Sequence, residues 1–137
     1  MDQFAIEFAL KADLEWLVRH DKHVDRAILE KKLIRQEVLV ARSNDGIMGW
    51  LRYSLFWDSI PFINMLVVLE NHRRRTVGSS LVQYFEAHMK EQGHSRVMTS
   101  TQSDESGQHF FRKVGYEDVG SLLLPPEPLE IMLMKRL

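Results

Sequence analysis

The chain has 137 residues, the size of one ordinary domain, with 45% apolar and 27% charged residues, as in water-soluble globular proteins. Its formal net charge of −1 argues against bulk attraction to nucleic acid or to an anionic membrane. The absence of cysteine excludes disulfides, thiolate nucleophiles and Cys-ligated zinc.

The N-terminus, Met1-Asp2-Gln3-Phe4, lacks the basic stretch and the apolar run of a signal peptide. No apolar run approaches the ~20 residues of a membrane span. The sequence also has no internal repeat and no linker rich in glycine, serine or proline. We therefore expect a cytoplasmic protein with one domain over residues 1–137 that binds neither membrane nor nucleic acid.

The N-terminal third predicts one strand and two helices. Apolar residues alternate over residues 4–8, which indicates a short strand. Asp13 resembles an N-cap, and a helix is expected from there to about residue 21. A second helix is expected over residues 25–36, with Ile28, Leu29 and Leu33 on its inner side and Lys32 as a further candidate for that side.

Three consecutive strands are expected next, over residues 38–41, 47–56 and 62–69. The first two are joined by Ser43-Asn44-Asp45-Gly46, a turn signal because Asn, Asp and Gly tolerate positive φ. Asp58-Ser59-Ile60-Pro61 predicts a second turn. These connections are short enough for antiparallel pairing.

The C-terminal half begins with a long helix expected over residues 76–92, which Gly93 ends. Its apolar stripe recurs every four residues, at Val77, Leu81, Phe85 and Met89. A strand over residues 96–101, a helix over 106–114 and strands over 116–123 and 129–134 complete the chain. The order β-α-α-β-β-β-α-β-α-β-β predicts an α+β domain with a mixed sheet.

The passage from residue 69 into the helix near Thr76 has the chemistry of a phosphate site. A helix N-terminus offers unpaired N–H groups and partial positive charge. Gly78 permits close approach, Ser79 and Ser80 keep bulk low, and a basic run adds charge-assisted donors. That run is Arg73, Arg74 and Arg75.

The stretch from Val68 to Leu81 resembles the acetyl-CoA signature of the GNAT N-acetyltransferase superfamily, with Arg73 at its first position and Gly78 at its last. Thr76 stands where the middle glycine usually lies. The resemblance implies a twisted sheet of about six to seven strands flanked by about four helices. It also implies that the pyrophosphate of acetyl-CoA binds at Arg73–Ser80, including Val77.

A later motif, His109 to Tyr116, is similar to the family's helix against CoA, with Phe111 and Lys113 as the implied contacts. The family inserts pantetheine where the strands over residues 62–69 and 96–101 splay apart. Its amides would pair with the backbone of Leu66, Val67 and Val68. Many members carry Tyr at Phe111 as the acid for the departing thiolate, and Phe cannot donate a proton. Ser106, His109 and Tyr116 lie nearby in the sequence, which does not single out any of them as a replacement acid.

Acetyl transfer also needs a base for the amine. The candidates are Glu105, Asp104 and Asp58, although helix capping and solvent exposure are competing interpretations. Glu70 is a fourth, better explained by a salt bridge. His20 and His23 are read as surface residues and not as metal ligands, so no metal is expected.

The resemblance implies a transferase that moves the acetyl group of acetyl-CoA, its cosubstrate, to the primary amine of a small molecule or peptide in a ternary complex. The alternative is a regulatory module that binds CoA without catalysis. A domain that uses the arginines to contact nucleic acid or protein is disfavoured by the near-neutral charge. The acceptor is open, and a homodimer is the commonest assembly for such domains. The resemblance also makes residues 19–25 the lid over the acceptor.

Overall fold

The computed structural model describes residues 3–70 and 76–137, so the expectations for Arg73, Arg74 and Arg75 fall outside the described residues. Within those ranges the helices and strands follow the predicted order, with a short 3-10 turn, η1 (Lys11–Asp13), before the first α-helix. The strands form one seven-stranded sheet in the order β1-β2-β3-β4-β5-β7-β6. Strands β4 and β5 are parallel and their neighbours antiparallel where pairing is described, which confirms the mixed α+β class.

The chain divides into two compact units. Unit 1 comprises the described residues up to Arg52 and those from Met65 to Val82. Unit 2 comprises Tyr53–Asn64 and Gln83–Leu137. Three elements contribute residues to both units: β3 (Gly46–Phe56), β4 (Ile60–Val68) and α3 (Val77–Glu91). The expected single domain over residues 1–137 stays a prediction.

Unit 1 is built on a meander of β1 (Ala5–Phe8), β2 (Val38–Ser43) and the first part of β3. The predicted hairpin is confirmed, because Ser43 pairs with Gly46, whose φ of +115° suits glycine alone. Ala41 then faces Gly49 while Arg42 faces Ile47. The extra residue between them on β3 makes a β-bulge.

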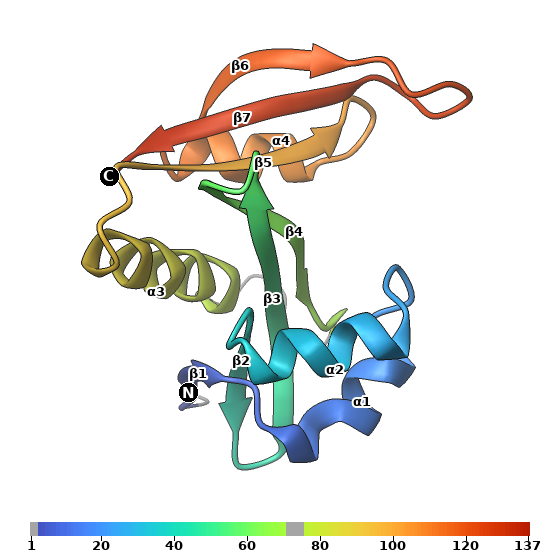
Figure 1. Ribbon diagram of the computed structural model, residues 1–137, viewed down its shortest axis with the longest axis vertical. Coiled ribbons are helices and arrows are strands. Elements are labelled where there is room, and N and C mark those ends of the chain that lie inside the picture. The colour runs from blue at the N-terminus through green and yellow to red at the C-terminus, as the bar shows by residue number, and fades with distance from the viewer. Residues whose placement is uncertain (1–2, 71–75) are drawn as a thin grey trace. The chain divides into compact units, whose positions relative to one another are not determined.

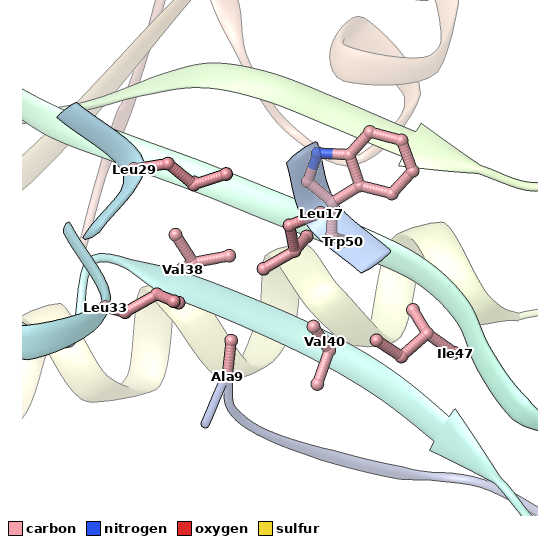
Figure 2. Close-up of a cluster of buried hydrophobic side chains, with 8 residues drawn as sticks. All are labelled: Ala9, Leu17, Leu29, Leu33, Val38, Val40, Ile47 and Trp50. Atoms are coloured by element: carbon pink, nitrogen blue, oxygen red, sulfur yellow. The ribbon is translucent and has the colours of Figure 1, made fainter. Parts of the chain in front are cut away.

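Helices α1 (Leu14–His20) and α2 (Arg26–Ile34) lie over the strands of unit 1 (Figure 1). Figure 2 shows how their leucines meet side chains of β2 and β3 in one apolar cluster, whose members are Ala9, Leu17, Leu29, Leu33, Val38, Val40, Ile47 and Trp50. Leu17 and Leu29 are fully buried, and each such leucine contributes about 2 kcal/mol through burial. This cluster fixes both helices on the sheet.

Two details of the helical region differ from expectation. Ile28 is 48% exposed and does not join Leu29 and Leu33, because these two leucines at i and i+4 already define the inner stripe. Asp13 precedes α1 with a helical backbone, so its side chain does not cap that helix. Its carboxylate instead accepts the Leu10 N–H at 2.7 Å and pairs with Arg42 at 2.7 Å.

Unit 2 contains the parallel start of β4 beside β5 (Arg96–Gln102), and β7 (Glu130–Arg136) runs antiparallel to both β5 and β6 (Glu117–Leu122). Helix α4 (Gly107–Lys113) lies alongside these strands (Figure 1). Ile60, Met98 and Met132 form a small core. The turn before β4 is shorter than predicted: Trp57 and Asp58 form it with φ of 55° and 60°, and the strand resumes at Ile60.

The long helix α3 agrees closely with expectation. Its four stripe residues, Val77, Leu81, Phe85 and Met89, are all buried. Gly93 follows with φ of +93°, and its N–H donates to the Lys90 carbonyl, as expected for a helix C-terminus. No helix within the described ranges is long and apolar enough to cross a membrane.

Candidate functional site

The C-terminal half of β4 packs unusually close to β3 in unit 1. A Cβ atom placed on Gly49 would lie 2.6 Å from the Val67 carbonyl oxygen and 3.2 Å from the Val68 Cα. The Leu69 N–H also donates to the Met48 carbonyl at 2.9 Å. Gly49 therefore lets β4 approach a position that any other residue would block. Sequence reasoning missed this, although an isolated glycine inside a strand signals close backbone approach.

The first turn of α3 is the phosphate-binding candidate of unit 1. Its Thr76 carbonyl accepts the Ser80 N–H at 2.9 Å and the Ser79 hydroxyl at 3.1 Å. Val77 is fully buried, whereas Gly78, Ser79 and Ser80 are half-buried. The first N–H groups of the helix have no carbonyl partner within the helix and lie at the positive end of its dipole. The structure thus provides the helix start at the predicted position.

The parallel ladder between β4 and β5 is short. Within the described residues it consists of Phe62 opposite Met98 and Ile63 opposite Thr99. The Thr99 hydroxyl reinforces the last pair by donating to the Ile63 carbonyl at 3.0 Å. Strand β4 then continues to Val68 without further pairing to β5, while β5 continues to Gln102 along β7. Leu66, Val67 and Val68 lie in this continuation and are half-buried.

Phe111 is a core residue of unit 2, only 5% exposed. Its ring meets those of Phe110 and Tyr116 edge to face, at 5.2 Å in each case. Lys113, one turn from the end of the same motif, is exposed. The buried ring explains why an apolar residue is stable at position 111, and it offers no proton.

Tyr116, whose ring contacts Phe111, belongs to a partly buried polar cluster. Its hydroxyl donates to Glu86 Oε2 at 2.9 Å, and Lys135 Nζ donates to Glu86 Oε1 at 3.0 Å and to the Val114 carbonyl at 2.9 Å. Burial, followed by the neighbouring Glu86 carboxylate, raises the pKa of Tyr116 far above its usual value. Tyr116 is therefore held neutral and engaged, which argues against it as the replacement acid.

The three acidic candidates are all exposed and lie in unit 2. Asp58 sits at the tip of the β3–β4 hairpin, in a different turn from the other two. Glu105 Oε1 accepts the Gln102 N–H at 3.2 Å, so this carboxylate closes the turn after β5. Asp104 precedes it, and Ser106 holds the position before α4. The structure gives Glu105 a structural contact and leaves the roles of Asp58 and Asp104 as predictions.

A buried ion pair anchors the connection between α1 and α2 to β3 in unit 1. Asp21 ends α1 with no exposed side-chain area, and its carboxylate accepts two bonds from Arg52, at 2.7 and 3.2 Å. Trp50 Nε1 donates to the same carboxylate at 3.2 Å. Sequence reasoning missed this cluster because no local pattern links residues about thirty positions apart.

Two basic side chains near this anchor are also engaged. Burial lowers the pKa of Lys32, although its 3.4 Å contact with Glu37 opposes the shift. His20 stacks on Trp16 with ring centroids 3.8 Å apart, and its Nδ1 lies 2.7 Å from the Trp16 carbonyl. The observed contacts of His20, at the C-terminal end of α1, are therefore with Trp16. No cluster of metal-ligating side chains occurs among the described residues.

Known proteins share this architecture. A sequence profile of the acetyltransferase (GNAT) family matches residues 6–116, which is most of the chain. The chain belongs to this family. No curated protein matches its sequence.

Solved structures agree with this assignment over nearly the whole fold. A GNAT-family acetyltransferase from Bacillus cereus has a TM-score of 0.83 at 25% identity, with 98% of this chain and 97% of that chain covered. Ard1 from Thermoplasma volcanium has a TM-score of 0.84 at 20% identity, with 97% of each chain covered. The PaiA N-acetyltransferase from Thermoplasma acidophilum, solved with coenzyme A, has a TM-score of 0.80 at 14% identity and covers 98% and 99%.

Proposed function

We propose that this chain transfers the acetyl group of acetyl-CoA to a primary amine of a small molecule or peptide. The observation that carries the proposal is the short β4–β5 ladder, which ends at Ile63 while β4 continues to Val68. An extended ligand that bears amides can add to such a strand edge. The pantetheine arm of acetyl-CoA is a ligand of this kind, and Leu66, Val67 and Val68 are its proposed backbone partners.

The start of α3 is the proposed site for the pyrophosphate. The N–H groups of Val77, Gly78 and Ser79 lie in the first turn, where the helix dipole favours an anion. Thr76 and Ser80 complete the loop, and the basic run before Thr76 supplies charge in the proposal, through Arg73, Arg74 and Arg75. Phe111 and Lys113 are the proposed contacts from α4.

The chemistry is one bond exchange in a ternary complex. The amine nitrogen attacks the thioester carbonyl carbon, a C–N bond forms, the C–S bond breaks and CoA leaves as its thiolate. The attacking nitrogen loses a proton to a base, with Asp104 favoured here over Asp58 and over Glu105, which the turn already engages. Holding both reactants in line supplies most of the rate, because it removes the entropic cost of their encounter.

A second candidate function is CoA binding without catalysis. The observation that favours it is the buried, hydroxyl-free ring of Phe111. Both candidates require CoA binding, and only turnover separates them.

Calorimetric titration with acetyl-CoA, followed by thiol release over a panel of small amines, amino acids and peptides, tests both candidates. Gly78→Val should reduce acetyl-CoA affinity at least about tenfold, because its branched side chain obstructs the helix start that faces the phosphate. Ala87→Val places the same β-branched side chain at an exposed position of the same helix and serves as the control. Amine-dependent thiol release supports acetyl transfer, and binding without release across the panel supports the second candidate. Unaltered affinity in Gly78→Val would refute the phosphate site.

A further inference from the structure

The connection between β6 and β7 carries leucines that the core of unit 2 does not use. Leu123 is 79% exposed and Leu124 is 54% exposed, and the exposed fractions of Leu122 and Leu129 are 45% and 36%. Figure 1 shows this connection as the loop that joins the two strands. Single exposed leucines are ordinary on protein surfaces, whereas several at one place mark an interaction surface. We call these four residues the leucine patch.

Hydrogen bonds tie this connection to the rest of unit 2. The Glu127 N–H donates to the Leu124 carbonyl at 2.9 Å and closes a turn. The Leu129 carbonyl accepts the Ser103 N–H at 2.8 Å, and Gln102 Nε2 donates to the Glu127 carboxylate at 3.3 Å. The leucine patch is therefore held on an ordered loop. A partner that binds there does not bear the entropic cost of ordering it.

The charged residues around the leucine patch are acidic. Glu127 lies within the connection, and Glu130 begins β7 opposite Leu122 on β6. No lysine or arginine occurs over residues 114–134. The hydrogen bond of the Glu127 carboxylate goes to the amide of Gln102, a neutral group that leaves the negative charge uncompensated. The surface thus combines exposed leucine side chains with negative charge.

Charge decides among the candidate occupants of this surface. An anionic membrane and a nucleic acid carry the same sign of charge as Glu127 and Glu130, so both are repelled. A second copy that placed its own leucine patch here would also bring like charges together. A polypeptide with apolar side chains next to lysine or arginine matches both properties, because it covers the leucines while its cations lie beside the carboxylates.

We propose that the leucine patch, with Glu127 and Glu130, is a docking surface for another polypeptide, one with a segment of apolar side chains flanked by lysine or arginine. Burial of the leucines supplies the affinity. The two carboxylates orient the segment and raise its rate of association. Docking of this kind requires neither acetyl-CoA nor acetyl transfer, so it goes beyond the proposed reaction.

Fluorescence anisotropy with two labelled synthetic peptides tests the proposal. The first peptide repeats Lys-Leu-Leu-Lys and has the proposed chemistry. The second repeats Glu-Leu-Leu-Glu, with the same apolar content and the opposite charge. At low salt the protein should bind the lysine peptide at least about tenfold more tightly than the glutamate peptide. High salt should reduce this preference, because it screens exposed charges.

Substitutions of leucine test the apolar part of the surface. Leu123→Ser combined with Leu124→Ser should weaken binding of the lysine peptide at least about tenfold, because these side chains supply much of the buried area. Ile34→Ser is the matched control, since Ile34 is 83% exposed in α2 of unit 1, beside the basic Arg35, and this variant should retain the affinity. Both variants change exposed side chains, so their Tm should stay close to that of the unsubstituted protein.

Substitution of an acidic residue tests the charge. Glu127→Gln keeps an acceptor for Gln102 and removes the negative charge, so it should weaken binding of the lysine peptide about two- to fivefold at low salt. Asp45→Asn makes the same change in net charge at an exposed turn of unit 1 and should leave the affinity unchanged.

Three peptide results would overturn the proposal: no binding of the lysine peptide to the unsubstituted protein, equal binding of the glutamate peptide, or unchanged affinity in the double leucine variant. Two further measurements address the other occupants. A dimer in sedimentation velocity that the double leucine variant dissociates would assign the patch to a second copy. Cosedimentation with vesicles of phosphatidylcholine and phosphatidylserine would assign it to a membrane. Either result would overturn the proposal as well.

Discussion

Gly49→Ala tests the close approach of β4 to β3 in unit 1. The added Cβ would lie 2.6 Å from the Val67 carbonyl oxygen and 3.2 Å from the Val68 Cα, and both neighbours are backbone atoms. The Val67 carbonyl must retreat by about 1 Å to restore an ordinary contact of ~3.5 Å. Gly49 itself lies outside the left-handed region, so alanine adds no backbone strain there. The expected effect is therefore steric.

Forcing extra volume into a packed site costs about 1–3 kcal/mol. For a chain of this size, about 2 kcal/mol lowers Tm by roughly 8 °C. Acetyl-CoA affinity should fall as well, because the displaced carbonyl belongs to one of the proposed backbone partners. Thermal unfolding by circular dichroism and calorimetric titration measure the two effects on the same sample.

Gly107→Ala is the matched control. Its Cβ would meet only the Thr101 methyl, at an ordinary 3.5 Å, and alanine favours the helix by about 0.5–1 kcal/mol. This variant should be as stable as the unsubstituted protein or slightly more so. If Gly49→Ala matched the control in Tm and in affinity, β4 would not depend on the missing side chain, and the reasoning would be refuted.

Three further predictions concern buried charges and hydroxyls. Asp21→Asn should lower the free energy of unfolding by about 3–5 kcal/mol, measured by urea unfolding, because Arg52 keeps its charge in a buried site. Replacing both Asp21 and Arg52 with apolar residues should recover much of this loss. Burial raises the pKa of Asp13, but the Arg42 contacts and the Leu10 N–H together outweigh it, so the pKa lies below its unfolded value. The ionised Asp13 carboxylate therefore stabilises the fold above about pH 4, and this contribution is lost as the pH falls through the lower pKa of the folded state. In Asp13→Asn the free energy of unfolding should accordingly fall less steeply as the pH is lowered. Burial and the neighbouring Glu86 carboxylate raise the pKa of Tyr116, so this tyrosine should ionise only when the protein unfolds at high pH. In an alkaline titration followed by tyrosinate absorbance, Tyr116→Phe should lack the part of the signal that appears on unfolding. Ionisation of Tyr116 in the folded protein would contradict its burial.

Local patterns predicted much of the fold. The stripe of α3 and the Ser43–Gly46 hairpin were predicted because one helical face or one turn carries the whole signal. The periodicity of apolar residues predicted helix α2 but not the boundary of its buried face, because Ile28 lies on the exposed side. The hairpin at Trp57 and Asp58 was misplaced by two residues because its left-handed pair contains no glycine.

The site was less predictable for a different physical reason. The position of the α3 start followed from glycine and serine at a strand–helix junction. The anchor of Asp21 on Arg52 depends on which helix end packs against which strand. Such properties arise from tertiary pairing and have no signature within a window of residues. The role of Asp104 stays a prediction for the same reason.

The buried ion pair of Asp21 with Arg52 determines which positions in the connection between α1 and α2 can be substituted without loss of packing. The connection between α1 and α2 starts at the buried Asp21, and the buried Leu29 holds α2 after it, whereas Lys22 and His23 within the connection are exposed. Substitutions at those two positions alter surface chemistry without disturbing the packed residues on either side. Substitutions at Lys22 and His23 should therefore change the stability of the fold little, so different side chains can arise at these two positions during evolution without loss of folding.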